Sequence, residues 1–241
     1  ATVNVAAASN PFTFGTTTTL TGSGGSGTGA FSYAVASAGT AGCSIASGTN
    51  TVSATSAGTC TVTATRAGDS SYSTATSAPL TLTVSPATQA TVTVAAATNP
   101  ITYGTTTTLT GSGGNGTGAF SYAVASAGTA GCSIASGSNT VSATGAGSCT
   151  VTATKAADAN YGAATSAPLT ITVDQAAQAT VYVAAASNPF TYGTTTTLTG
   201  TGGRGTGAFR YAVASAGTAG CSITGGNTLG ATSGGTCSVT A

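Results

Sequence analysis

Residues 59–66 read TCTVTATR, a segment in which small apolar and polar side chains alternate at every position. The cysteine, valine and alanine fall on one side and the threonines on the other, which is the period of a half-buried β-strand. The pattern recurs as SCTVTATK at residues 148–155 and begins again as TCSVTA at residues 236–241. The segment therefore predicts a strand that is repeated in tandem.

The sequence around this segment repeats as well. One stretch begins at Ala1 and returns at Ala90 and Ala179, as ATVNVAAASNPFTFGTTTTLTGSGG, ATVTVAAATNPITYGTTTTLTGSGG and ATVYVAAASNPFTYGTTTTLTGTGG. A fixed period of 89 residues indicates tandem copies of one folding unit. We therefore expect three domains: residues 1–88, residues 89–177, and an incomplete third at residues 178–241 that lacks its last strand or strands.

Each repeat contains about seven segments of this alternating kind. In the first copy they cover residues 2–6, 16–21, 30–36, 42–46, 51–54, 59–66 and 79–84. Asn10-Pro11 interrupts the chain after the first segment, because proline cannot donate to a sheet ladder. The glycine-rich stretch Gly22–Gly29 predicts a flexible loop. Short strands with one apolar face each predict an all-β fold in which two antiparallel sheets pack as a sandwich.

Six cysteines occur as two in every repeat. Six cysteines allow 15 pairings, but the periodicity favours one bridge inside each unit: Cys43 with Cys60, Cys132 with Cys149, and Cys221 with Cys237. A bridge of this kind stabilises a unit by about 3 kcal/mol in the chain-entropy model. Paired cysteines predict an oxidising compartment and hence export. The alternative, two buried free thiols in each unit, remains open.

The composition is poor in charge. Four basic and three acidic residues give a net charge of +1 in 241 residues, and histidine, methionine and tryptophan are absent. Without a basic patch we expect no nucleic-acid partner. No apolar run approaches the roughly 20 residues of a membrane span. A neutral surface of Thr, Ser, Ala and Gly suits close lateral packing of copies, although it equally describes a hydrated or glycosylated spacer.

The residues offer little for catalysis, and we expect no enzyme activity and no cofactor. Without His or Glu there is no Ser-His or Cys-His dyad and no glycosidase carboxylate pair. Asp69, Asp158 and Asp174 cannot supply the six to eight oxygens of a repeated calcium site. The cysteines lack the spacing of zinc ligands. We therefore predict no metal site.

Several stretches resemble the bacterial Ig-like repeats of large secreted and surface proteins. They are NPFTYGTTTTLTGTGG, GCSITGGNTLGATSGGTCSVTA and TKAADANYGAATSAPLTITV, and most specifically GTCTVTATRAGDSSY at Gly58 and GSCTVTATKAADANY at Gly147. The resemblance covers essentially the whole chain. It implies tandem immunoglobulin-like sandwiches with an intradomain disulfide, at the cell surface or outside the cell.

By position, the resemblance also implies that Asp69 and Tyr72, like Asp158 and Tyr161, lie in a hairpin before the last strand. The third copy ends before that hairpin.

Two functions follow as hypotheses. The first is a structural repeat of an extracellular filament, sheath or surface array, whose partners are copies of itself or neighbouring repeats. The second is an inert stalk that presents an adhesin's binding tip located elsewhere. A glycan-binding surface finds little support, because the candidate exposed residues are few: Tyr182, Arg204 and Arg210 of the third copy. An Ig-like decoration of a phage particle is allowed by the fold, but no residue indicates it.

Overall fold

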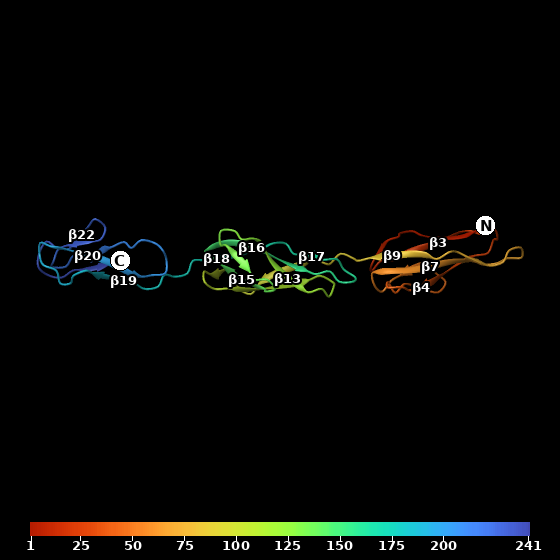
Figure 1. Cartoon of the computed structure of the whole chain (residues 1–241), viewed down its shortest axis with the longest axis horizontal. Helices are drawn as coiled ribbons and strands as arrows, with labels where there is room; N and C mark the ends of the chain where they lie inside the picture. Colours follow the sequence, from red (N-terminus) through yellow and green to blue (C-terminus); the bar gives the residue numbers. More distant parts are fainter. The chain divides into compact units, whose positions relative to one another are not determined.

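A computed structural model describes all residues, 1–241, and contains 24 strands and no helix. The chain divides into two compact units, Ala1–Gln175 and Ala176–Ala241 (Figure 1). The first unit holds the first two repeats and the second unit holds the third. The exclusive use of strands follows from the sequence, which is rich in β-branched residues and glycine and lacks a helical apolar period.

Nine strands build the first repeat. They are β1 (Val3–Ala7), β2 (Phe12–Thr13), β3 (Thr18–Gly24), β4 (Phe31–Ser37), β5 (Ser44–Ile45), β6 (Thr51–Ser53), β7 (Gly58–Arg66), β8 (Ala75–Thr76) and β9 (Leu80–Ser85). One sheet has the order β1-β3-β6-β5, and the other has the order β2-β9-β7-β4 with β8 also paired to β7. All pairs are antiparallel except β2 with β9, which is parallel.

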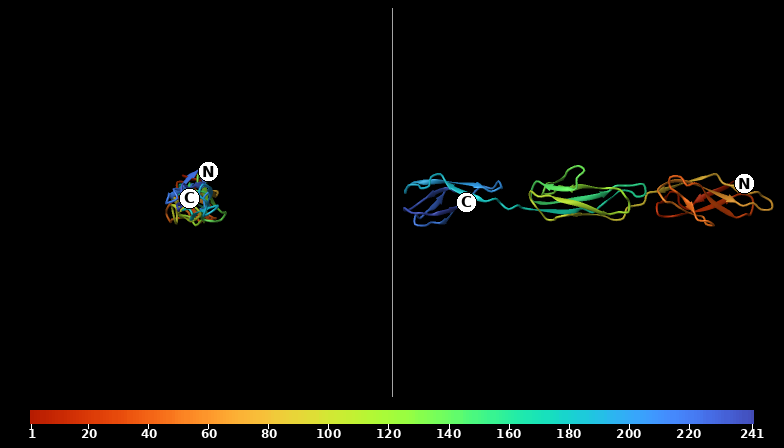
Figure 2. Two further views of the ribbon diagram at one scale, coloured as in Figure 1. Left: turned by 90° about the vertical axis from the view of Figure 1, so that its left-hand side faces the viewer. Right: turned by 90° about the horizontal axis from the view of Figure 1, so that it is seen from below.

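The second repeat has the same plan. Its strands are β10 (Val92–Ala96), β11 (Ile101–Thr102), β12 (Thr107–Gly113), β13 (Phe120–Ser126), β14 (Cys132–Ile134), β15 (Thr140–Ala143), β16 (Gly147–Lys155), β17 (Ala164–Thr165) and β18 (Leu169–Asp174). The orders are β10-β12-β15-β14 and β11-β18-β16-β13, with β17 on β16, and the strands form two facing layers (Figure 2). The predicted all-β class, an immunoglobulin-like antiparallel sandwich, is confirmed.

The core of each sandwich lies between its two sheets. In the first repeat Leu20, Val52, Val62 and Leu82 are completely buried there. The disulfide Cys43–Cys60 crosses this core, from the residue just before β5 in one sheet to β7 in the other. Cys132–Cys149 takes the same position in the second repeat. Each bridge therefore adds a covalent link between the two sheets of its sandwich.

Two details differ from the sequence prediction. The structure adds the two-residue strands β2 and β8 to the seven expected. The flexible loop predicted at Gly22–Gly29 is wrong in its first part, because β3 continues through Gly24. A Cβ on Gly22 would lie only 2.4 Å from the ring of Phe31, so glycine admits that ring against the strand. The Gly22 amide also donates to the hydroxyl of Tyr33 at 2.8 Å.

Six strands form the third repeat. They are β19 (Val181–Ala185), β20 (Thr195–Gly202), β21 (Ala212–Ser215), β22 (Ser222–Thr224), β23 (Thr228–Gly230) and β24 (Ser238–Thr240). One sheet, β19-β20-β23-β22, matches its counterparts, and the second contains only β21 and β24. Cys221–Cys237 again joins the two sheets. Residues 176–241 contain no counterpart of β9 or β18.

Candidate functional site at the junction of the first two repeats

A five-residue loop of the second repeat, Asp158–Gly162, lies between β16 and β17 and is ordered by its own aspartate. Oδ1 of Asp158 accepts hydrogen bonds from the amides of Asn160 and Tyr161, both at 2.9 Å. Its Oδ2 accepts from the amide and the hydroxyl of Thr117, on the loop before β13. The bond from the Thr117 amide is the main reason that the pKa of Asp158 lies below its ordinary value.

The first repeat builds the same loop around Asp69. The amides of Ser71 and Tyr72 donate to Oδ1 at 2.9 Å, and the amide of Thr28 donates to Oδ2 at 2.7 Å. These bonds, with that from Thr28 the largest cause, lower the pKa of Asp69 to about 2. The resemblance placed Asp69, Tyr72 and their counterparts in a hairpin before the last strand, and the structure puts them in the β7–β8 and β16–β17 loops. Their carboxylates fix loop shape.

The side chain of Asn160 connects this loop of the second repeat to the first repeat. Its Oδ1 accepts hydrogen bonds from the hydroxyl of Ser56 at 3.0 Å and from the amide of Ala57 at 2.9 Å. Both donors lie just before β7, at the end of the first sandwich. The contact therefore joins residues that are 103 positions apart in the chain.

The backbone of the loop pairs with the linker between the repeats. The amide of Ala87 donates to the carbonyl of Asn160, and the amide of Gly162 donates to the carbonyl of Ala87, each at 2.8 Å. Ala87 and Tyr161 thus form an isolated parallel bridge. The sequence places the linker at Ser85–Gln89. Two backbone hydrogen bonds at Ala87 therefore restrict the rotation that an unpaired linker would allow.

An aromatic contact completes the junction. The rings of Phe14 and Tyr161 meet edge to face, with centroids 5.7 Å apart and an interplanar angle of 85°, a favourable arrangement for two quadrupoles. Tyr161 is half-buried, whereas its counterpart Tyr72, which meets no such ring, is 52% exposed. Tyr103, the counterpart of Phe14, is 47% exposed. The two rings that meet at the junction are therefore less exposed than their counterparts in the other repeat of the pair.

The end of the linker is fixed to the second repeat by Gln89. Its Oε1 accepts hydrogen bonds from the amides of Asn115 and Gly116, at 2.8 and 2.9 Å. In the third repeat Gln178 makes the same pair of bonds, to the amides of Arg204 and Gly205. A glutamine at the end of both linkers thus anchors the linker to the repeat that follows it.

The remaining residues singled out by the sequence lie apart from the junction. The cysteines are in the cores, linked as described. Tyr182 is 64% exposed on β19, and Arg204 and Arg210 are exposed. No group of three or more His, Cys, Asp or Glu side chains is placed to hold a metal ion. No helix of sufficient length and apolarity to cross a bilayer is present.

Sequence reasoning missed Asn160 and Gln89. Asn160 gave no signal, because the equivalent residue of the first repeat is Ser71. Gln89 did give a signal. The linkers SPATQ (85–89) and DQAAQ (174–178) share only their third residue, an alanine, and their final glutamine. A glutamine kept at the same place in two otherwise different linkers indicates a specific contact, which the structure shows as the pair of backbone hydrogen bonds that Gln89 and Gln178 each accept.

Comparisons with known proteins give distant structural likenesses alone. No family model and no curated protein matches the chain. An Escherichia coli adhesin, FdeC, is similar at 20% identity over 95% of this chain and 88% of its own, with a TM-score of 0.28. The S-layer protein rSbsC is similar at 16% identity over 99% of this chain and 36% of its own, with a TM-score of 0.28.

The extracellular cadherin domains 1–4 of protocadherin gamma B7 are similar at 12% identity, over 95% of this chain and 68% of their own, with a TM-score of 0.29. These values transfer no function to this chain.

Proposed function

We propose that this chain is a non-catalytic structural segment of an extracellular array, at the cell surface or in a filament or sheath. Its units are the tandem repeats 1–88, 89–177 and 178–241, of the bacterial Ig-like kind. The junction of the first two repeats carries the proposal, because Asn160 and Ala87 join these repeats by hydrogen bonds and Gln89 fixes the end of the linker to the second repeat. A chain built this way passes load from one repeat to the next.

Two further features support a mechanical role. Each repeat has one disulfide between its sheets, which limits how far a strained repeat can open. The outward positions of the strands carry Thr and Ser, and the net charge is +1. A neutral surface lacks the repulsion that keeps molecules apart. We therefore propose that copies associate side by side through these Thr, Ser, Ala and Gly surfaces.

The second candidate is an inert stalk of a surface adhesin. One observation favours it: the junction of the first two repeats is made entirely within one chain, so an extended array needs no second molecule. In that case the binding tip lies elsewhere, and these repeats only hold it away from the cell.

Electron microscopy of native material, sheared from the cells that make it, separates the two. Ordered filaments with a regular axial repeat are expected from lateral association. Thin threads of single-chain width would contradict it and support the stalk.

Variants of the isolated chain make the same distinction. Thr81 and Thr83 are exposed on β9, so the double substitution T81K/T83K adds positive charge to one outward face. If neutral surfaces drive association, sedimentation velocity will show fewer oligomers than for the matched T81S/T83S control. Equal behaviour of the two variants, or monomers at every concentration, counts against this association.

A further inference from the structure

The longest edge strands of the first two repeats are β4 and β13. Each has seven residues and the same sequence, FSYAVAS, whereas the other edge strands, β1, β2, β5, β10, β11 and β14, have two to five residues. β4 pairs with β7 alone and lies at the margin of its sheet (Figure 1), and β13 pairs with β16 alone. One side of each strand is therefore open to pairing with another chain.

The pairing with β7 identifies the backbone groups on the open side. Hydrogen-bonded and non-hydrogen-bonded pairs alternate along two antiparallel strands. The amide of Ala67, just after β7, donates to the carbonyl of Ala30, just before β4, at 2.9 Å. Every second residue from Ala30 onward therefore bonds to β7. The residues between them turn their amide and carbonyl groups to the open side: Phe31, Tyr33 and Val35.

The second repeat gives the same assignment. The amide of Ala156 donates to the carbonyl of Ala119 at 2.9 Å, with the register of β13 on β16 unchanged. The groups on its open side are those of Phe120, Tyr122 and Val124. Two equivalent edges, one in each repeat, thus present the same unpaired backbone groups.

The edge carries little that would keep another strand away. FSYAVAS contains no charged residue and no proline, which are common means of blocking an edge. The bulge of β4 lies between Val35 and Ser37, beyond the open residues. In the second repeat a hollow of about 280 Å³ lies beside the edge, between residues 120–122 of β13 and residues 137–139 of the β14–β15 turn. The turn therefore leaves space along this part of the strand.

The side chains of the edge suit a close neighbour. Ser32, Ala34 and Ala36 are exposed and small, so the outer face of the strand offers no bulky group. The side chains on the inner face are half-buried, and the Tyr33 hydroxyl is held by the amide of Gly22 at 2.8 Å. The strand is thus already ordered before a partner arrives.

An identical strand matches this edge. If two FSYAVAS strands run antiparallel about a two-fold axis at Tyr33, Phe31 of each lies opposite Val35 of the other. All the open residues then fall in hydrogen-bonded pairs, with two bonds in each pair. Aromatic residues opposite β-branched or aromatic residues are favourable cross-strand pairs. On the outer face Ser32 lies opposite Ala34, so no charge enters the contact.

We propose that β4 and β13 join this chain, edge to edge, to a second copy of itself by antiparallel pairing of their FSYAVAS segments. Such a contact is isologous, because both copies contribute the same patch, and it merges one sheet of each copy into a continuous sheet. Main-chain hydrogen bonds supply its affinity. This rests on the proposed association between copies and supplies a specific contact for it.

The first test places charges at the positions that the register sets opposite each other, in the full 241-residue chain. The variant S32K/A34K/S121K/A123K brings lysine opposite lysine, and sedimentation velocity is expected to show association at least about tenfold weaker than in the wild type. The variant with aspartate at the same four positions is expected to lose association equally. The uncharged control S32T/A34S/S121T/A123S should associate like the wild type. Wild-type association by the lysine variant overturns the proposal.

Hydrogen exchange read by NMR locates the contact. The amides of Tyr33 and Tyr122 face the open side, so their exchange is expected to slow at least about tenfold as the protein concentration rises. Those of Ser32 and Ser121 face the neighbouring strand and should not change. An equimolar mixture of the lysine and aspartate variants should restore the protection of Tyr33 and Tyr122, which also shows that both variants are folded. A mixture without this protection overturns the proposal.

The same data separate this contact from association through other surfaces. If the wild-type chain associates while Tyr33 and Tyr122 exchange rapidly at every concentration, edge pairing is wrong and lateral association stands. If the chain stays monomeric at every concentration, both are wrong.

Discussion

Oδ1 of Asn160, in the second repeat, lies 2.9 Å from the backbone amide of Ala57, in the first. This bond reaches from a loop of one sandwich to the end of another. With the Ser56 hydroxyl as a second donor, it makes the orientation of one repeat dependent on the loop structure of the next. The loop in turn depends on Asp158.

Replacing Asn160 by alanine is expected to loosen the junction and leave both cores intact. A hydrogen bond of this kind contributes about 1 kcal/mol, so amide exchange at Ala57 should accelerate about five- to tenfold. Hydrogen exchange read by NMR measures it. Ser71→Ala, at the equivalent exposed position of the first repeat, should leave the exchange at Ala57 unchanged. Unaltered protection in Asn160→Ala would show that the side chain does not hold the junction.

The loop around Asp69 in the first repeat should make the free energy of unfolding depend on pH in the acid range. The folded pKa of Asp69 is about 2 and its ordinary value is 3.8. The unfolded chain therefore takes up the proton first as the pH falls. The stabilisation is complete above about pH 4 and declines as the pH drops towards 2. Thermal unfolding followed by circular dichroism across this range is the measurement, and Asp69→Asn should flatten the dependence. An equally steep dependence in the variant would rule out this carboxylate as a source.

Gly111 should not tolerate a side chain. A Cβ there would lie 2.4 Å from the ring of Phe120, so Gly111→Ala is expected to lower the free energy of unfolding by about 1–3 kcal/mol. Gly145→Ala is the matched control in the same repeat, because its nearest atom is 3.9 Å away, and its effect should stay within about 0.5 kcal/mol. Denaturant titration compares the two. Similar losses would mean that the ring moves aside.

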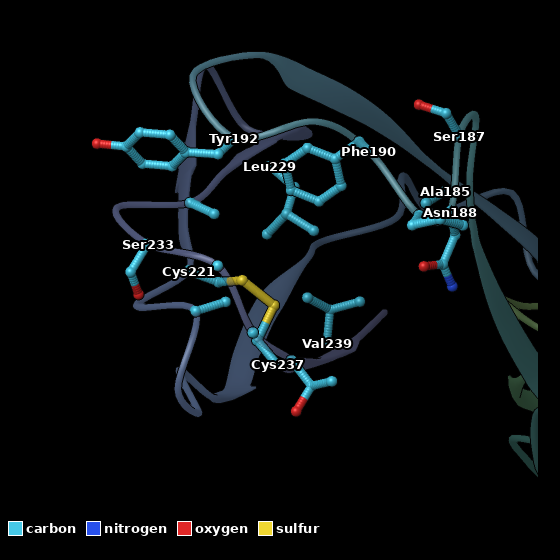
Figure 3. A pocket seen from close by; sticks show the side chains of 16 residues that line it. Ala185, Ser187, Asn188, Phe190, Tyr192, Cys221, Leu229, Ser233, Cys237 and Val239 are labelled. Carbon is cyan, nitrogen blue, oxygen red and sulfur yellow. A yellow bond between two sulfur atoms is a disulfide. The ribbon is translucent and has the colours of Figure 1, made fainter.

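The three disulfides should differ in their resistance to reduction. Cys60 and Cys149 are 2% and 3% exposed, whereas Cys237 of the third repeat, whose bond to Cys221 is drawn in Figure 3, is half-buried. A brief treatment with a phosphine under native conditions, followed by alkylation and mass spectrometry, should label Cys221 and Cys237 first. Simultaneous labelling of all three pairs would indicate that access is governed by unfolding of the whole chain.

Local alternation was enough to predict the sandwich. In residues 59–66 the parity of one strand already places Cys60, Val62 and Ala64 inside, and the structure buries all three. The glycines were harder to interpret, because Gly22 resembles loop sequence until the ring of Phe31 is known to lie on it. The junction could not be predicted in this way, because the contact of Asn160 with Ala57 spans 103 positions and leaves no local period.

The first two repeats each have the aspartate-ordered loop, and the first repeat also has the partners that the loop of the second contacts, the Phe14 ring and the Ala57 amide. Tyr103 and Tyr192 stand at the position of Phe14 in the other two copies. One 89-residue period thus contains the positions for both sides of the contact, the loop on one side and the aromatic ring with the backbone amide on the other. One residue of the loop separates a copy that can bind its neighbour in this way from one that cannot, because Ser71 has no carboxamide oxygen where Asn160 accepts both hydrogen bonds.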